Sequence, residues 1–534
     1  MKINTIALAV FSSILLVSCS GVSNKSGGGT KNFQSLTGWK PNEKGGWYFT
    51  DKTEKPKATP GMVFVQGGTF TMGAIKDDVL GEWNNTPKRM QVRSFMIGET
   101  EVTNYEYKEY LSWLSYVFPP ENKVNRDIVA GATPDSLVWG NKLSRNDIYI
   151  TNYLRHPSFN YYPVVGVSWV QAKRYCEWLT DRANEKALMD KGILSKDLYS
   201  NPEMVKGQSR FSTEAYRYDP KSLQGIVDST KLNKQSVTAR NENPRIKPAT
   251  YSTSTVADFR LPTEVEWEYA ALGLETNRRY NKIKGKTNPY ESIRGAKGNQ
   301  RGQYLANVKN GRGDYSGLGG STTDGNAITS DVRFHPANDF GLYGMLGNVS
   351  EWTEDVYRPI IDDEANDINY VRGNIYTRKI KNESGKYQKV GDNDLEFDTL
   401  ADGSRIYRQL PGDIKYEIID DARNYRDGDY LSSLDAGMYW GEEDPKANVY
   451  NAPTRKFRVD DSGRVYMEKD PTFRTTDIND ESRVIKGGSW KDDLYYLDPA
   501  QRRYANQFQG SNWVGFRVAQ DVLGEESTFG KSKK

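Results

Sequence analysis

Cysteine and histidine are scarce in this chain, which has two residues of each type among 534. Two cysteines exclude a framework of several disulfides and a cysteine-rich zinc site. Two histidines leave little for metal binding or acid–base chemistry by imidazole groups. The charge is nearly balanced, with 73 basic and 70 acidic residues, which argues against a general nucleic-acid-binding surface.

Aromatic side chains, in contrast, are abundant: the chain has 34 Tyr, 18 Phe and 12 Trp residues. Disordered chains lack such residues, so we expect most of this chain to fold around an aromatic-rich core. At roughly 100–200 residues per domain, the length allows about three domains, or one domain with long insertions.

The N-terminus has the pattern of a secretory signal peptide over residues 1–18. Lys2 is followed by apolar runs at 6–10 and 14–17, and the stretch ends in Leu16–Cys19, which resembles the bacterial lipobox. We therefore expect Cys19 to become the lipidated first residue of the mature protein. The alternative is an ordinary signal peptide with a chance cysteine.

Residues 19–59 are expected to form the lipidated N-terminus and a tether, and residues 522–534 a mobile tail. No apolar run is long enough for a membrane-spanning helix, so acyl chains would supply the anchor. The stretch Ser20–Asn24 contains no acidic residue. By similarity to the sorting signals of bacterial lipoproteins, this favours the outer membrane, facing the periplasm.

The folded body is expected over residues 60–521. Apolar runs at 63–65 and 70–72 predict two short strands around a glycine turn. Three capping-box patterns, in which a Ser or Thr precedes a Glu or Gln by three residues, each lead into a helix-period apolar stripe; they begin at Thr103, Ser168 and Thr263. The intervening loop-rich sequence indicates an α+β fold rather than a regular α/β sheet.

Seven short motifs follow one another along this body: Gly67–Gly73, Glu101–Asn104, Pro163–Trp169, Arg260–Ala270, Phe340–Trp352, Arg483–Trp490 and Gly515–Arg517. In this order they resemble the formylglycine-generating enzyme (sulfatase-modifying factor) family, from about Gly61 to Asp521. The resemblance implies a C-type-lectin-like α+β fold that is poor in regular secondary structure.

The enzymes of that family use a copper-binding cysteine pair shortly after the Lys-Gly-Gly-Ser motif, because thiolates are soft ligands for Cu(I). Aligned on this motif, the two positions are Asp492 and Leu497 here. Cys176 lies on the apolar stripe of its expected helix, where a buried, inert thiol is expected. The resemblance therefore implies a non-catalytic member that binds no copper.

Other catalytic arrangements are weak in this sequence. Glu264, Glu266, Glu268, Asp492 and Asp493 could be interpreted as glycosidase carboxylates. However, the first two fall in the first turn of a helix, where acidic side chains favour capping and the helix dipole. The two histidines, His156 and His335, each precede a proline and have no nucleophile motif nearby.

Calcium is the cofactor that the resemblance leaves open. One family site would take oxygen atoms from Asn307, Val308, Asp324 and Asn326, and hard oxygen donors suit Ca²⁺. Ordinary turn chemistry explains the same Asn and Asp residues equally well. A second site would use Gly347, Val349 and Glu351, but Gly344 stands where the family has an Asp or Asn ligand.

Two long insertions separate the family motifs, at about 181–258 and 358–482. They mix charged residues with Tyr, Trp and Arg, a composition typical of protein interfaces. A lipobox, lost cysteines and such insertions also occur together in gliding-motility lipoproteins of the Bacteroidota. That resemblance implies a structural lipoprotein whose partners are other outer-membrane and periplasmic proteins of gliding and type IX secretion. Alternatives are a ring subunit of the secretion machinery, a glycan- or peptidoglycan-binding module, and a residual oxidase.

Overall fold

The computed structural model describes residues 59–73, 85, 87–140, 146–219, 223, 226–227, 256–273, 304–309, 324, 326–357, 377–418, 457–459, 465–467 and 481–522. All of them fall in one compact unit within Thr59–Leu523. The expected signal peptide, Cys19, most of the tether and nearly all of the C-terminal tail lie outside the described residues.

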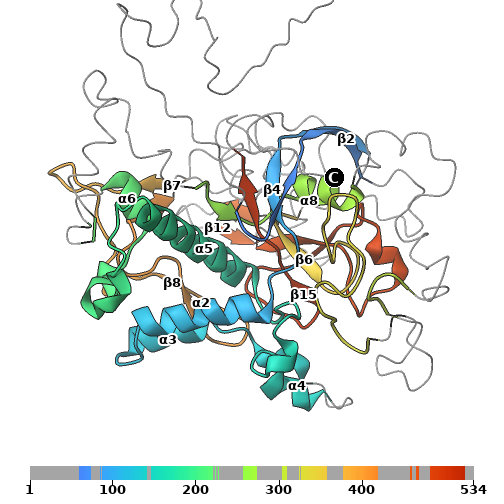
Figure 1. Ribbon diagram of the computed structural model, residues 1–534, viewed down its shortest axis with the longest axis horizontal. Helices are drawn as coiled ribbons and strands as arrows, with labels where there is room; N and C mark the ends of the chain where they lie inside the picture. The colour runs from blue at the N-terminus through green and yellow to red at the C-terminus, as the bar shows by residue number, and fades with distance from the viewer. Residues whose placement is uncertain are drawn as a thin grey trace, which may run out of the picture. The chain divides into compact units, whose positions relative to one another are not determined.

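A four-stranded sheet brings together the middle and the end of the chain (Figure 1). Its strand order is β14-β13-β6-β15, with β6 at Ser350–Val356, β13 at Ser482–Lys486, β14 at Arg503–Asn506 and β15 at Val514–Gly515. Strands β6 and β13 are buried along nearly their whole length. They are antiparallel, with Ile485 opposite Trp352 and a register irregularity between Arg483 and Ile485.

A second sheet has the order β1-β4-β16-β5. In it, β16 from the end of the chain pairs with β4 from the N-terminal part of the body. It contains β1 (Met62–Val65), β4 (Phe95–Gly98), β16 (Ala519–Asp521) and β5 (Phe259–Arg260). The two strands expected around the glycine turn do form, but they do not pair with each other. Instead, β1 pairs with β4, and β2 (Gly68–Met72) pairs with β3 (Lys88–Val92).

The three predicted capping boxes are confirmed, each with both reciprocal hydrogen bonds. They begin α2 (Asn104–Val117), α5 (Trp169–Asp190) and α8 (Glu264–Leu272). Helix α8 ends at Gly273, whose φ of 65° suits a residue without Cβ. Helix α5 runs through Asp181 to Asp190, so the expected insertion boundary at 181 falls inside a continuous helix.

The core between α2 and α5 is built largely from aromatic rings. Tyr107 stacks on Tyr175 at a centroid distance of 5.5 Å, and Tyr110 and Tyr175 both contact Trp178. Phe516, from the end of the chain, packs edge-on against Tyr175 at 5.4 Å. The high tyrosine content therefore fills an interior that aliphatic residues occupy in other proteins.

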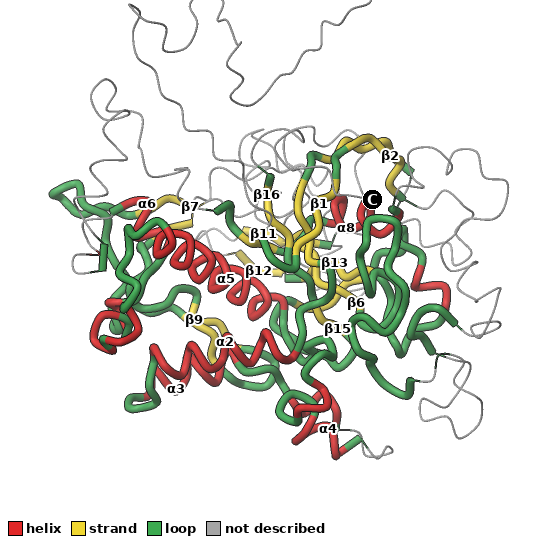
Figure 2. Tube along the Cα trace, viewed as in Figure 1, coloured by secondary structure: helices red, strands yellow, loops and turns green. Residues whose placement is uncertain are grey.

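The remaining regular elements are short, and loops make up much of the described chain (Figure 2). The helices are α3 (Lys123–Ala132), α4 (Asp147–Asn152) and α6 (Thr213–Tyr218), with several single-turn 3₁₀ helices between them. Three two-stranded antiparallel sheets lie in the described parts of the second insertion: β7 (Thr377–Lys379) with β10 (Tyr416–Ile418), β8 (Phe397–Thr399) with β9 (Arg405–Tyr407), and β11 (Phe457–Val459) with β12 (Val465–Met467). Helices and mainly antiparallel sheets together make the α+β fold that the sequence predicts. Within the described part of the chain, no helix combines the length and apolarity needed to cross a membrane.

Candidate functional site

The segment after β13 carries Asp492 and Leu497, the positions that the sequence resemblance aligns with the cysteine pair of the family's enzymes. Gly487 and Gly488 have φ angles of 96° and 69°, which reverse the chain and bury Ser489 completely. The Ser489 hydroxyl donates to Asp492 Oδ2 at 2.5 Å. Arg503 on β14 donates to both oxygens of Asp492, at 2.7 Å each. Asp492 is therefore held in a bidentate ion pair.

Leu497 lies in a different environment from Asp492. Its side chain is fully buried with Ala306 and Val308 in a small apolar cluster. An aliphatic group and a carboxylate already bound by a guanidinium supply no soft ligand, so these two positions do not fit copper(I). Cys176 offers no substitute, because it is buried on α5 and burial raises the pKa of its thiol.

The acidic residues of α8 are engaged in structural contacts. Glu266 closes the capping box at Thr263 and also binds Arg260. Glu264, expected to serve the cap and helix dipole, instead forms a buried ion pair with Arg502. Glu268 accepts from Lys486 Nζ at 2.9 Å and from the Gly73 amide at 2.7 Å. These carboxylates are committed to cations and amides, an arrangement that fixes α8 to the sheets rather than one that moves protons.

The expected first calcium site has one feature that fits a cation. Asp324 accepts from the Asn326 amide through Oδ1, whereas its buried Oδ2 has no hydrogen-bond partner among the described residues. Burial also raises the pKa of this carboxyl. Asn307 is buried and donates through Nδ2 to Ile328 O, which leaves its amide oxygen as the available ligand atom. Asn307, Val308, Asp324 and Asn326 can therefore supply the hard oxygen atoms that Ca²⁺ requires.

The described residues contain no group of three or more Asp, Glu, His or Cys side chains placed to hold a metal. A calcium ion at Asp324 would thus depend largely on amide and backbone oxygens.

At the expected second calcium site, another carboxylate takes up the space. A Cβ atom on Gly344 would lie 2.3 Å from both carboxylate oxygens of Glu101, which is fully buried. Both oxygens of Glu351 are bound by Arg517 at 2.5 Å, and one also accepts from Trp267 Nε1. The missing side chain at Gly344 therefore makes room for Glu101, a contact between distant segments that the sequence did not indicate. Gly347 and Val349 lie on the same turn leading into β6.

The two histidines have separate, local surroundings. His156 is exposed and caps a short 3₁₀ helix by accepting from the Ser158 amide at 3.2 Å. His335 packs edge-on against Phe334, and burial lowers its pKa to about 4. The structure does not bring either histidine together with Asp492 or Asp324.

The described parts of the two insertions form a folded region with its own apolar cluster. Residues from the end of α5 and from the first insertion pack around Phe211 and Tyr216, and the second insertion contributes Ile414, which is fully buried. Arg210 ties the two insertions together, since it donates to Asp181 on α5, to Asp413 and to the Pro411 carbonyl. Sequence composition indicated interfaces here, but it gave no signal that the two insertions contact each other.

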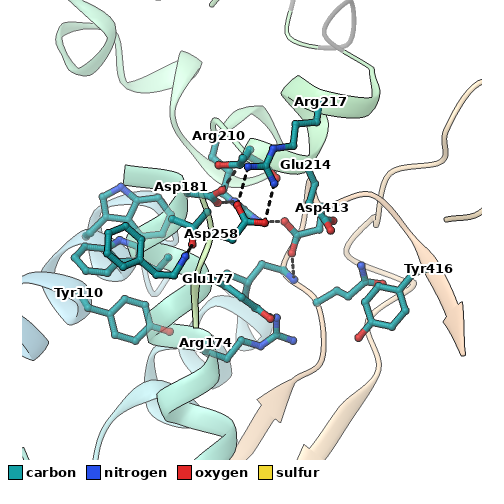
Figure 3. Close-up of a pocket in the computed structure, with 18 residues that line it drawn as sticks. Tyr110, Arg174, Glu177, Asp181, Arg210, Glu214, Arg217, Asp258, Asp413 and Tyr416 are labelled. Carbon is teal, nitrogen blue, oxygen red and sulfur yellow. Dashed lines mark hydrogen bonds and ion pairs between the residues drawn. The ribbon is translucent and has the colours of Figure 1, made fainter. Parts of the chain in front are cut away.

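A cavity of about 180 Å³ opens where this region meets α2 and α5 (Figure 3). Aromatic side chains line one part of it, with Tyr110, Trp113 and Trp178 from the helices and Tyr416 from β10. The charged lining residues are three arginines and five acids, namely Arg174, Arg210, Arg217, Glu177, Asp181, Glu214, Asp258 and Asp413. The cavity joins the described parts of both insertions to the core helices α2 and α5.

Comparison with known proteins gives a family match over residues 48–397, described as the sulfatase-modifying factor enzyme 1-like domain. This match covers more than half of the chain. The match ends inside the second insertion. Asp492 lies beyond that insertion and outside the matched residues.

Three relatives illustrate the extent of the similarity. The formylglycine-generating enzyme of Mus musculus is 40% identical over 101 residues, covering 19% of this chain and 23% of the relative. That of Bos taurus is 23% identical over 317 residues, covering 56% and 59%. The inactive C-alpha-formylglycine-generating enzyme 2 of Mus musculus is 36% identical over 105 residues, covering 20% and 28%. The chain therefore matches less than two thirds of the length of each of these relatives.

Proposed function

Because the chain belongs to the sulfatase-modifying factor family, we propose that it is a non-catalytic member that acts as a partner-binding scaffold. The observation that carries the proposal is the pair Asp492 and Leu497 at the positions of the catalytic cysteines. Arg503 neutralises the first and an apolar cluster buries the second. A relative named as inactive supports the idea that the family contains members without the oxidase activity.

The architecture of the insertions supports a binding role. A solvated decoration would not need its own apolar cluster or a buried arginine between the two insertions. A region held in place by these contacts can present a defined surface to another protein, and little conformational entropy is then lost on binding. The proposed fold for the whole body is the C-type-lectin-like one of the family.

The cellular setting that we propose comes from the sequence. It is the outer membrane, facing the periplasm, with a lipid anchor at Cys19. The motifs resemble those of gliding-motility lipoproteins, in particular the GldJ type. The GldK/PorK type is the alternative. Partners would then be other proteins of gliding motility and type IX secretion.

Catalysis is tested by oxygen consumption and peptide-cysteine oxidation with added copper. We expect no turnover and no stoichiometric copper binding by the purified chain. A copper-dependent rate that is lost after Cys176→Ala would instead establish an oxidase with a relocated thiol.

Scaffolding is tested by cross-linking in intact cells, followed by purification and residue-level mapping. We expect cross-links from the insertions to outer-membrane or periplasmic proteins. Recovery of the chain without any protein partner, together with saturable binding to peptidoglycan, would replace the scaffold with a glycan-binding module.

Calcium is proposed as a structural ion at Asn307, Val308, Asp324 and Asn326, where it would neutralise the unpartnered Asp324 oxygen. Metal content and melting temperature should both fall after treatment with a chelator. An Asp324→Asn variant should no longer respond. Unchanged metal content and melting temperature in the parent protein would show that the site is absent.

A further inference from the structure

We propose that Glu101 supplies the carboxylate ligand that the expected second calcium site lacks at Gly344, and so completes a structural calcium site beside β6. The inference goes beyond the proposed scaffold role and does not depend on it. It follows from where the Glu101 oxygen atoms lie, from which of them has no partner, and from the charge of the surrounding interior.

The carboxylate of Glu101 lies in the volume that a side chain at position 344 would fill. Both of its oxygen atoms are 2.3 Å from the position of a Cβ atom built on Gly344. Ordinary bond lengths place the side-chain oxygen of an Asp or Asn about 2.4 Å from its own Cβ. Glu101 lies between β4 and α2, so a residue distant in sequence brings oxygen atoms within the reach of the missing ligand.

One of these two oxygen atoms is available to an ion. Glu101 is fully buried, and its Oε1 accepts from Asn348 Nδ2 at 3.0 Å. Its Oε2 has no hydrogen-bond partner among the described residues. An unsatisfied buried carboxylate oxygen is unfavourable, whereas a bound ion would satisfy it. Asn348 lies between Gly347 and Val349, whose backbone oxygens are other ligands expected at this site. The hydrogen bond therefore holds the carboxylate beside them.

Glu351 can contribute a second carboxylate, although it already accepts three hydrogen bonds. Its Oε2 accepts from Trp267 Nε1 and Arg517 Nε. Its Oε1 accepts only from Arg517 Nη2 among the residues that the structure describes. A carboxylate has about four lone-pair sites, so Oε1 retains one for an ion.

The charge of this interior also favours a cation. Glu101, Glu351 and Arg517 are each fully buried, and Glu101 interacts electrostatically with both of the others. Two carboxylates and one guanidinium leave one negative charge without compensation, which is strongly unfavourable in a protein interior. All the candidate ligands are oxygen atoms, which suit Ca²⁺ rather than a soft metal. A calcium ion would therefore satisfy both the unpartnered oxygen and the charge.

Burial determines how quickly this ion would exchange. Because neither carboxylate is exposed to solvent, the ion would be enclosed as the segments around it pack together. Asp324, at the expected first calcium site, is 9% exposed. A brief treatment with a chelator should therefore remove only the ion at Asp324. The ion at Glu101 should leave only during prolonged treatment, so calcium content should fall in two separate phases.

The test is the calcium content of the full-length protein, purified from cultures supplied with calcium and measured by inductively coupled plasma mass spectrometry. The measurement uses the Asp324→Asn background, which removes the expected first site. We expect one calcium ion per chain in this background. Adding Glu101→Gln keeps the shape of the side chain and removes its charge. It should weaken calcium binding at least about tenfold, because the affinity of such sites depends on the number of charged ligands.

Glu99→Gln is the matched control for this change in charge. The Glu99 side chain is 33% exposed and forms an ion pair with Arg333, so its replacement leaves the oxygen atoms of the buried site in place. In the Asp324→Asn background this variant should keep its calcium ion. Circular dichroism establishes that each variant is folded.

A ligand swap separates metal binding from a merely structural role of Glu101. Glu101→Ala/Gly344→Asp, in the same background, removes the carboxylate from one segment and supplies one from the other. Gly344 has a φ of 66°, in the left-handed region that Asp and Asn tolerate better than most residues with a side chain. Calcium content should be lost in Glu101→Ala and recovered in the swap variant.

Three results would overturn the proposal. The first is an Asp324→Asn protein that contains no calcium. The second is equal calcium affinity in the Glu101→Gln and Glu99→Gln variants. The third is a folded swap variant that contains no more calcium than Glu101→Ala, and this comparison also decides the question if Glu101→Gln does not fold.

Discussion

Arg210 is expected to hold the two insertions together, and its replacement should release them without unfolding the core. The change is Arg210→Met, which keeps an unbranched apolar side chain in place of the arginine stem and removes the guanidinium. It abolishes bonds to Asp181, Asp413, Pro411 and Phe211. Two carboxylates are then left side by side without their shared cation.

The expected loss of stability follows from the burial of the Arg210 ion pairs. Removing one partner of a buried ion pair costs about 3–5 kcal/mol. Asp181 and Asp413 remain 16% and 18% exposed, so water relieves part of that cost and about 3 kcal/mol is a reasonable expectation. This corresponds to a rise of roughly a hundredfold in the opening equilibrium of the insertions.

Hydrogen exchange monitored by mass spectrometry measures this opening directly. Amides in peptides from 193–216 and 405–416 should exchange roughly a hundredfold faster, while those of β13 should not change. Arg378→Met is the control, because Arg378 is 70% exposed and its side chain bonds only Glu417 among the residues that the structure describes. Unchanged exchange in both insertions would refute the bridging role. Equal acceleration throughout the body would show that Arg210 serves the whole fold instead.

Three further predictions concern stability. Arg517→Met leaves the buried Glu351 carboxylate without its cation and should lower the unfolding free energy by about 3–5 kcal/mol, whereas Arg378→Met should change it by less than about 1 kcal/mol in denaturant titrations. Thr263→Ala removes the side-chain acceptor of the capping box and should cost about 1 kcal/mol by the same measurement, with Thr263→Ser retaining most of the stability. Burial raises the folded-state pKa of Glu214 from its ordinary value of 4.5 to about 7, so the unfolded state binds fewer protons between those values and stability should fall as pH rises from about 4.5 to 7. In Glu214→Gln this part of the decline should disappear, and an identical pH profile for the variant would contradict the assignment.

The sequence predicted the local features of the fold well. Capping boxes depend on residues three apart, so Thr103, Ser168 and Thr263 correctly marked the starts of three helices. Two strands, β1 and β2, were also identified by their apolar runs, but their pairing was not. The partner of β1 is 30 or more residues away, and nothing in either strand alone specifies it.

Long-range contacts account for what the sequence did not reveal. Glu264 does lie in the first turn of α8, as predicted, but its buried ion pair with Arg502, beyond the second insertion, was not predicted. Glu101 fills the space beside Gly344, and only the folded backbone brings these residues together. The lining of the cavity comes from five separate stretches of the chain, so its chemistry could not be predicted from any one of them.

Ile414 has a consequence for the order in which the protein is made. Its fully buried side chain completes an apolar cluster whose other members lie between Leu188 and Val227. At a synthesis rate of ~5–20 residues per second, roughly ten to forty seconds separate the emergence of Val227 from that of Ile414. During that interval the first insertion exposes the apolar surface that Ile414 later covers. Chaperone contacts on the nascent chain should therefore concentrate there and end once residue 414 becomes available.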